Sequence, residues 1–316
     1  MNILCRKLSL DVPIFQGGMG NISHAQLTGA ISAAGALGTI GAGTMKPQEL
    51  EKIILEVKKM TDKPFCLNIP IAVQPYLNEI FELVFKHHIP VVSLSAGNPK
   101  PFIPTFQASG VKVICVVASV KQAIKAESAG ADVLVAEGYE AAGINSNDET
   151  TTLTLIPQIV KAVKIPVVAA GGIADGSGFL AMLALGAEGV QMGTRFIATK
   201  EAMVHDEYKQ SILRADDTAT VIVGRSIGRV RRILKNDYAK KLLELEKSGT
   251  TADVFNHYTD ETRHIVGAIK GKLEEGHVNS GQIAGLIDDL PSVSVLINRM
   301  MKEARSINEV LHKKLS

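Results

Sequence analysis

The sequence predicts an α/β fold, a (β/α)8 TIM barrel followed by a mostly helical C-terminal appendage. Three observations predict it. Eight short runs of apolar, largely β-branched residues recur through the first two-thirds of the 316-residue chain. Each run is apolar throughout, as in parallel strands that are covered on both faces. Amphipathic helical stretches separate the runs, and eight strand–helix units are the number that closes into such a barrel.

The eight predicted strands follow one another in chain order. They span residues 12–16, 37–40, 65–69, 91–94, 112–117, 133–136, 167–169 and 189–192. The clearest helix between them is predicted over 46–60, where the 3.6-residue period is followed by Leu50, Ile53, Ile54 and Val57. An open doubly wound sheet is the alternative. It is disfavoured because residues 16–20 (QGGMG) lack the GxGxxG spacing and no acidic residue ends the second strand.

The composition changes near residue 200, and this change predicts the domain organisation. Residues 1–200 form the predicted barrel, whereas residues 201–316 are richer in charge, with helices predicted over 240–248 and 293–312. No stretch rich in Pro, Gly or Ser separates the two regions. We therefore expect the appendage to pack against the barrel and to contribute to the substrate site. A coiled coil is excluded because no apolar heptad persists.

Composition excludes several classes of protein. With 46% hydrophobic and 21% charged residues the chain is not disordered, and a formal net charge of +2 is too balanced for charge-driven binding of nucleic acid. Cys5, Cys66 and Cys115 are scattered and form no CxxC pair, which excludes a disulfide scaffold. No apolar run reaches the roughly 18 residues of a membrane span, and charges interrupt the amino terminus. A reducing cytoplasm is the expected setting.

Small residues follow six of the eight predicted strands, at the barrel end where reactive centres lie. They allow a flat ligand to lie close to backbone N–H and C=O groups. The loops after the last two strands are the most specific, because in barrels these loops and an exposed helix N-terminus commonly bind phosphate. The amides of Gly171, Gly172, Gly193 and Thr194, with the Thr194 hydroxyl, are therefore predicted to bind a phosphorylated ligand.

Several motifs together resemble one flavin-dependent family, which contains bacterial enoyl-acyl carrier protein reductase II and nitronate monooxygenase (2-nitropropane dioxygenase). The motifs are PIFQGGM at 13–19, DKPF at 62–65, SAGNP at 95–99, AEG at 136–138, AAGGIADG at 169–176 and GTRF at 193–196. In the appendage, RILKN at 232–236 and NSGQIAG at 279–285 resemble the reductase more than the monooxygenase. The resemblance spans nearly the whole chain.

The resemblance implies an FMN cofactor, with NADH or NADPH as co-substrate. Its phosphate would lie on the amides named above, its isoalloxazine against the backbone of Gly17, Gly18 and Met19, and Asn68 at the polar edge of the ring. For Asn68 a satisfied buried amide is the alternative. Further cofactor-binding residues implied by the resemblance are Glu137, Gly138 and, from the appendage, Gln282.

One departure from the family pattern concerns a catalytic base. The sixth strand usually leads into a Glu-x-x-Gly-Gly-His segment, but Ile144 stands here where the family has histidine. Because Asn145 cannot take up a proton at neutral pH, deprotonation of a neutral nitroalkane is disfavoured. Reduction of an enoyl thioester needs a proton as well, which Tyr139 or Asn145 could relay. His205 is the alternative base, and no histidine has metal-ligand spacing.

A basic run in the appendage has two interpretations. Its members are Arg225, Arg229, Arg231, Arg232 and Lys235. It is either a solvated face or a binding region for the 2′-phosphate of a nicotinamide nucleotide or for the acidic surface of acyl carrier protein.

Three functions remain open, in order of preference. The first is an FMN-dependent enoyl-acyl carrier protein reductase of fatty acid synthesis. The second is a nitronate monooxygenase that oxidises alkyl nitronates with O2, and the third is a non-catalytic barrel that binds a phosphorylated ligand. The expected ligand is an enoyl thioester or another small electrophile. Acyl carrier protein and a homodimer stay open as partners, while nucleic acid, a membrane and a bound metal are not expected.

Overall fold

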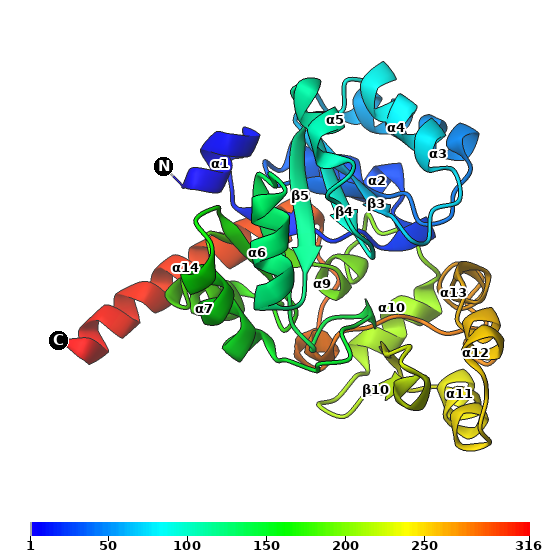
Figure 1. Ribbon diagram of the computed structural model, residues 1–316. Coiled ribbons are helices and arrows are strands. Elements are labelled where there is room, and N and C mark those ends of the chain that lie inside the picture. Colours follow the sequence, from blue (N-terminus) through cyan, green and yellow to red (C-terminus); the bar gives the residue numbers. More distant parts are fainter. Residues whose placement is uncertain (1) are drawn as a thin grey trace.

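Eight parallel strands form a nearly closed barrel in the computed structural model, which describes residues 2–316 (Figure 1). The strands are β1 (Ile14–Gln16), β2 (Gly38–Gly41), β3 (Phe65–Pro70), β4 (Val91–Ser95), β5 (Lys112–Val117), β6 (Val133–Glu137), β8 (Val167–Ala170) and β9 (Gly189–Met192). Their order is β1-β9-β8-β6-β5-β4-β3-β2. A parallel bridge between Phe15 and Leu37 brings the two ends of the sheet together. The predicted barrel is confirmed.

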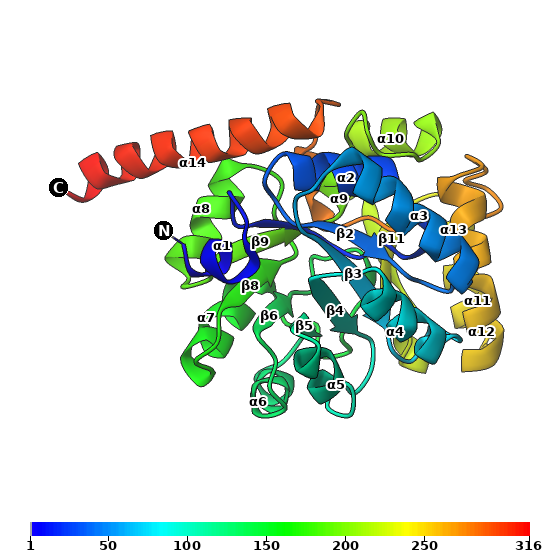
Figure 2. The same cartoon turned by 90° about the horizontal axis from the view of Figure 1, so that it is seen from above.

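Helices surround the strands in the view along the barrel (Figure 2). They are α2 (Ala25–Ala33), α3 (Pro47–Met60), α4 (Leu77–Lys86), α5 (Ile103–Ala108), α6 (Val120–Ser128), α7 (Thr152–Ala162), α8 (Gly176–Ala184) and the short α9 (Thr194–Ile197). The period in α3 puts Leu50, Ile54 and Val57 on one buried face. The first helix, α1 (Ile3–Leu8), packs its buried Leu4 and Leu8 with side chains inside the barrel.

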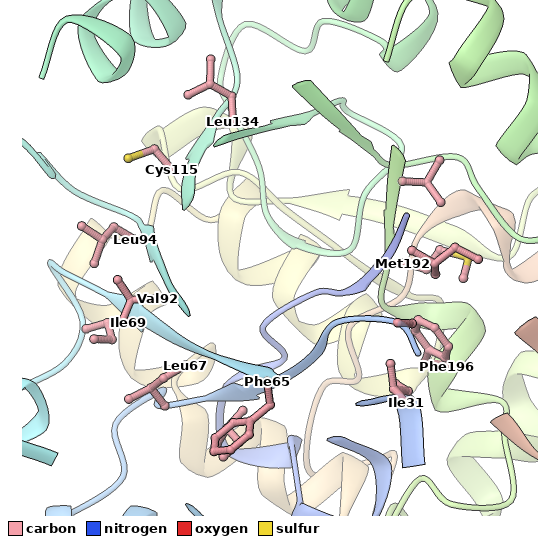
Figure 3. Close-up of a cluster of buried hydrophobic side chains, with 14 of the residues drawn as sticks. Ile31, Phe65, Leu67, Ile69, Val92, Leu94, Cys115, Leu134, Met192 and Phe196 are labelled. Atoms are coloured by element: carbon pink, nitrogen blue, oxygen red, sulfur yellow. The ribbon is translucent and has the colours of Figure 1, made fainter. Parts of the chain in front are cut away.

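Alternation along each strand divides the core into two layers. One layer, shown in part in Figure 3, lies between strands and helices and contains Leu67 and Leu134. The other lies inside the barrel and contains Cys66 and Val135, the neighbours of those residues. Two residues beyond Cys66 and Val135, the inward positions are the polar Asn68 and Glu137. These two strands therefore place polar side chains at the carboxyl end of the barrel.

The appendage contains a small sheet that the sequence did not predict. In it β11 (Arg231–Leu234) pairs antiparallel with β10 (Thr220–Val223) on one side and with β7 (Gly143–Ile144), from the barrel, on the other. Its helices are α10 (Asp206–Leu213), α11 (Asp237–Lys247), α12 (Ala252–Tyr258), α13 (Glu261–Ala268) and α14 (Val293–Leu315). The helices predicted over 240–248 and 293–312 are thus present as α11 and α14. The sheet ties the appendage to the loop that follows β6.

The long helix α14 returns to the barrel and then extends beyond it (Figure 2). Val293, Leu296 and Met300 are buried in the same core layer as side chains of α2 and α8. No helix within residues 2–316 combines the length and the apolar character that crossing a bilayer requires.

Candidate functional site

A cavity of about 1040 Å³ lies at the carboxyl ends of the barrel strands and continues beneath the appendage. Eight of the residues predicted to matter line it: Gly18, Met19, Asn68, Glu137, Ile144, Asn145, Gly193 and Thr194. Seven other predicted site residues do not line the cavity within residues 2–316: Gly17, Gly138, Tyr139, Gly171, Gly172, His205 and Gln282. The structure thus brings together the middle of the predicted site and leaves several flanking residues outside it.

Asn68 points into the barrel from β3 because it shares the inward face of Cys66. Its Nδ2 donates to the Ser93 carbonyl at 3.2 Å and to the Ser95 hydroxyl at 3.1 Å. A Cβ added at Gly18 would lie only 2.3 Å from the Asn68 Oδ1. The amide is therefore anchored through its nitrogen, and its oxygen faces the backbone of Gly18 at the cavity.

The turn after β8 carries two consecutive glycines in the left-handed region, Gly171 with φ +99° and Gly172 with φ +75°. Only glycine adopts such a pair of conformations readily. Across residues 2–316, the structure shows no hydrogen bond from the N–H groups of Gly171, Gly172, Gly193 or Thr194 outside regular strand and helix pairing. These amides are free to bind an anion.

Thr194, one of the four residues with a free amide, also links the barrel to the appendage. Its hydroxyl oxygen accepts a hydrogen bond from the Gly281 N–H at 2.9 Å, and Thr194 is buried. A hydroxyl that accepts one bond keeps its own hydrogen for donation. The Gly193 site has space, since an added Cβ would lie 3.7 Å from the nearest atom, the Met19 Sδ. This arrangement is compatible with a phosphoryl group between the last two loops.

The helix that follows the seventh barrel strand does not expose its N-terminus. α8 begins at Gly176, whose N–H donates to the Glu303 carboxylate of α14 at 3.0 Å. A Cβ at Gly176 would lie 2.6 Å from the Met300 carbonyl oxygen, so α14 packs directly on this end. Asp175 caps the same turn, as the sequence predicted, by accepting from the Gly178 N–H at 2.8 Å. An anion in this region would therefore be bound by the amides of the turn after β8 and of the start of α9, and not by the N-terminus of α8.

The loop after β6 is held from two sides. The buried Arg232 donates through Nε and Nη2 to the Tyr139 carbonyl at 3.0 and 2.9 Å, and its guanidinium lies 4.8 Å from the Tyr139 ring centroid. The Glu140 carboxylate accepts from both the N–H and the hydroxyl of Thr152, at the start of α7. The Tyr139 hydroxyl accepts from Arg225. Through these contacts Tyr139 holds the loop in place.

Ile144 occupies the cavity wall where the family histidine is expected. Its side chain is 56% exposed, and its strand β7 pairs with β11 through Arg231. Next to it, Asn145 uses Nδ2 to donate to the carbonyls of Ala141 at 2.9 Å and Gly143 at 3.2 Å. The amide hydrogens of Asn145 are thus committed to the loop.

Three further predicted site residues have structural contacts outside the cavity lining. His205 caps α10, where its Nδ1 accepts the Glu207 N–H at 3.1 Å. Gln282 has an exposed side chain, and its N–H donates to the Glu140 carbonyl at 3.0 Å. Gly138 packs so tightly that a Cβ there would lie 2.1 Å from the Thr152 hydroxyl.

The basic run does not form one face. Arg225 is paired with Glu149 at 2.6 Å, Arg232 is buried, and Arg229 is exposed. Arg231 lines the cavity, where its Nη1 lies 3.4 Å from the Asn279 Oδ1 and 3.5 Å from the His277 Nε2. Burial lowers the pKa of Arg231, although it stays a cation at neutral pH.

Two appendage residues of the cavity, Glu261 and His264, were not predicted from the sequence. Glu261 of α13 accepts from the Asn21 N–H at 3.3 Å, and His264 stacks on His277 with ring centroids 5.3 Å apart. Glu261 keeps a pKa below the usual value: burial acts to raise it, but His264, Arg231 and the Asn21 N–H together outweigh burial. About 240 residues separate the partners Asn21 and Glu261, so no local spacing could have shown the contact.

Glu137 has an unusual environment. It points into the barrel from the end of β6, opposite Ala170 of β8, and burial raises the pKa of its carboxyl group to about 7. Within residues 2–316, burial is the cause of this shift, with no contribution from a hydrogen bond or a neighbouring charge. Desolvation without a compensating charge favours the neutral acid.

Comparisons with known proteins give consistent results. A family model described as nitronate monooxygenase matches residues 2–84 and 70–303. A probable nitronate monooxygenase from Staphylococcus saprophyticus is 33% identical over 344 residues, covering 95% of this chain and 96% of that protein. The structure of FabK from Thermotoga maritima matches with a TM-score of 0.95 at 39% identity, over 99% of both chains. A nitroalkane oxidase from Streptomyces ansochromogenes matches with a TM-score of 0.85 at 25% identity, over 96% of this chain and 99% of that one.

Proposed function

The chain belongs to the nitronate monooxygenase family and is a flavin-dependent oxidoreductase, and we propose that it reduces the 2,3-double bond of an enoyl thioester with NADH or NADPH through bound FMN. The observation that carries the choice of reaction is Ile144. It places an alkyl group on the cavity wall where the oxidation of a neutral nitroalkane needs a base. The motifs of the appendage that resemble the reductase, and the similarity to FabK, support the same choice.

The residues present fit an FMN cofactor. The unpaired amides of Gly171, Gly172, Gly193 and Thr194, with the Thr194 hydroxyl, would bind its phosphate. The backbone at Gly18 packs directly on Asn68, since an added Cβ would lie 2.3 Å from the Asn68 Oδ1, and both residues line the cavity in which the ring would lie. When bound, the flavin would accept hydride from the nicotinamide and pass it to the thioester. Met19 and Asn68 would position the ring, and the appendage would exclude water from the cavity.

An anaerobic titration tests this proposal. The full chain with its flavin is reduced by NADH or by NADPH, which we expect to bleach the flavin absorbance, and crotonyl thioester is then expected to restore it. Propionate 3-nitronate with O2 is the matched alternative acceptor. Failure of both nucleotides to bleach the flavin, or restoration by O2 and nitronate but not by the thioester, would contradict a reductase.

Arg231 is the member of the basic run that reaches the cavity, so we propose that it binds a phosphate of the nicotinamide nucleotide rather than the surface of a carrier protein. Replacing Arg231 by methionine is expected to raise the KM for the nucleotide about 10-fold or more, because a charge-assisted bond contributes about 1.5–3 kcal/mol. The exposed Arg229→Met variant is the control. Equal KM values in the two variants would refute the assignment.

A nitronate monooxygenase activity is the second candidate, favoured by the 33% identity to the Staphylococcus saprophyticus protein. An anionic nitronate needs no base, so Ile144 disfavours only neutral nitroalkanes. Ile144→His is expected to raise turnover of neutral nitroalkanes by about 100-fold, the lower range for a positioned base. Oxygen uptake measures it, with Ile144→Gln as the control for polarity. No gain over Ile144→Gln, in a variant that keeps its flavin, would show that position 144 does not supply the base.

A further inference from the structure

We propose that His264 is the acid of the reductase reaction: its imidazole, oriented by the Glu261 carboxylate, delivers the proton that the α-carbon of the thioester requires. His264 acts within the proposed reductase function, on which this inference rests. It is a catalytic residue supplied by the appendage, and it replaces the histidine that is missing at position 144.

His264 lies close to the turn on which the flavin ring is expected. It belongs to α13 and lines the cavity. One turn earlier on the same helix, Glu261 accepts from the Asn21 N–H at 3.3 Å, directly after the glycine turn at 17–19. A Cβ at Gly20 would lie 2.6 Å from the Glu261 Oε1, so α13 packs on the backbone that continues this turn. The imidazole is therefore held at the flavin side of the cavity.

A second set of contacts leads to His264 from the position of the missing histidine. Arg231 is the register partner of Ile144 where β11 pairs with β7. Opposed residues of an antiparallel pair point to the same face of a sheet, so Arg231 lies beside Ile144. Its Nη1 lies 3.5 Å from the Nε2 of His277, whose ring stacks on that of His264 with centroids 5.3 Å apart. His264 thus borders the space between position 144 and the flavin turn.

The imidazole of His264 is buried without hydrogen-bond partners. It is 2% exposed, and within residues 2–316 neither ring nitrogen has a partner. A buried polar atom without a partner costs about 1–3 kcal/mol, and a catalytic role is one reason for a protein to keep it. Because the nitrogens have almost no contact with solvent, only a molecule that packs against the ring can exchange a proton with them. This favours a bound substrate over bulk water.

Glu261 orients and charges the ring. Its Oε2 lies 3.8 Å from the Nδ1 of His264, within the range of an ion pair. Burial acts to raise the pKa of Glu261, but His264 and Arg231 outweigh burial and keep it a carboxylate. A carboxylate beside an imidazole favours the protonated ring and fixes its orientation. Since the carboxylate faces Nδ1, Nε2 is the nitrogen that holds the transferred proton.

Four other ionisable groups around the cavity are less suited to supply this proton. Burial, Arg231 and His264 lower the pKa of His277 well below its usual value, which keeps that ring neutral. Tyr208 donates its hydroxyl hydrogen to a backbone carbonyl, and burial raises its pKa. Arg231 keeps its protons at neutral pH. Glu137 lies on the barrel side, among the residues expected to bind the flavin.

The reaction balances with His264 as the acid. A hydride derived from the reduced nicotinamide nucleotide, and passed through the flavin, forms a C–H bond at the β-carbon, while the C=C π-bond breaks toward the carbonyl. An N–H bond of the His264 imidazolium then breaks as a second C–H bond forms at the α-carbon. The nucleotide is oxidised, and the thioester is reduced by two electrons. The Glu261 side chain is 23% exposed and connects the ring to solvent, so His264 regains a proton from water after the product leaves.

His264→Gln tests the catalytic role, because glutamine keeps a planar polar group but has no acidic proton. We expect the thioester half-reaction, followed by stopped-flow reoxidation of the flavin, to slow about 100-fold more than the nicotinamide half-reaction. The exposed His257→Gln on α12 is the control and should change neither rate. Equal slowing of both half-reactions in His264→Gln would overturn the role of His264 as the acid.

Glu261→Gln tests the orienting role, because glutamine can still accept from the Asn21 N–H but carries no charge. In the parent enzyme the thioester half-reaction should slow as pH rises, because the imidazolium is lost. The variant should move the midpoint of this fall about one pH unit lower, since the carboxylate no longer stabilises the imidazolium. Arg231, the other charge near the ring, is present in both proteins. An unchanged midpoint would overturn the pairing of Glu261 with His264.

The failures of the two proposals can be told apart. A parent enzyme whose flavin is bleached by the nucleotide but reoxidised by no thioester would refute the reductase function, and the role of His264 with it. A parent that reduces the thioester, with the same rate and pH profile in His264→Gln, would refute the role of His264 alone. Circular dichroism and flavin content establish that the variants keep the fold. If His264→Gln does not fold, the midpoint in Glu261→Gln decides.

Discussion

Gly18→Ala is expected to weaken flavin binding by about 10- to 100-fold, while Gly17→Ala is expected to bind flavin normally. A Cβ at Gly18 would lie 2.3–2.6 Å from Oδ1, Cγ and Cβ of Asn68. Asn68 cannot retreat without losing its bonds to Ser93 and Ser95. Overpacking of this kind typically costs about 1–3 kcal/mol, here at the site where the ring would lie.

The neighbouring glycine is the matched control. A Cβ at Gly17 would meet the Gln191 side chain at 3.5 Å, an ordinary van der Waals distance. Flavin content after purification and the Kd for FMN from fluorescence quenching measure both variants. Equal affinities in the two variants would mean that the flavin does not lie against this turn.

The second large effect is expected at Arg232, which holds the loop after β6 against the appendage. Arg232→Lys should lower the free energy of unfolding by about 2–4 kcal/mol, because one ammonium group cannot reproduce two bonds to the Tyr139 carbonyl and a third to the Thr220 hydroxyl. For a chain of this size that corresponds to a decrease in Tm of about 5–10 °C.

Arg229→Lys provides the comparison, because Arg229 is exposed three residues away on the same segment. Substitutions at such surface positions usually change stability by no more than about 0.5 kcal/mol. Thermal unfolding followed by circular dichroism distinguishes the two variants. If both melt at the same temperature, the arginine is not what fixes the loop.

The barrel could be predicted from the sequence because its signal is local. Apolar runs such as 112–117 and 189–192 coincide with β5 and β9, since parallel strands must be apolar on both faces. The sheet of β10, β11 and β7 gave no such signal. β7 has only two residues, and β11 begins with two arginines, of which one is buried by contacts 93 residues away in sequence. Long-range burial of a charge leaves no periodic pattern in the sequence.

The part of the cavity at the barrel strands could be predicted from local sequence, because strand ends and glycine turns carry it. Gly171, Gly172 and Gly18 could be identified because the chain needs glycine there. The covering of the α8 N-terminus by Glu303 could not, because it depends on α14 returning 127 residues later. For the same reason Glu261 was not predicted, and the basic run could be named from the sequence without showing that Arg231 is the member that reaches the cavity.

The central claim is that this chain binds FMN. The proposed phosphate site after β8 and β9 allows the most direct test of it. Flavin-free protein is titrated separately with FMN and with riboflavin, which lacks the phosphate. We expect FMN to bind at least about 100-fold more tightly, because several charge-assisted bonds from backbone amides are lost with riboflavin. Equal affinities for the two flavins, or protein that stays colourless with excess FMN, would contradict the account.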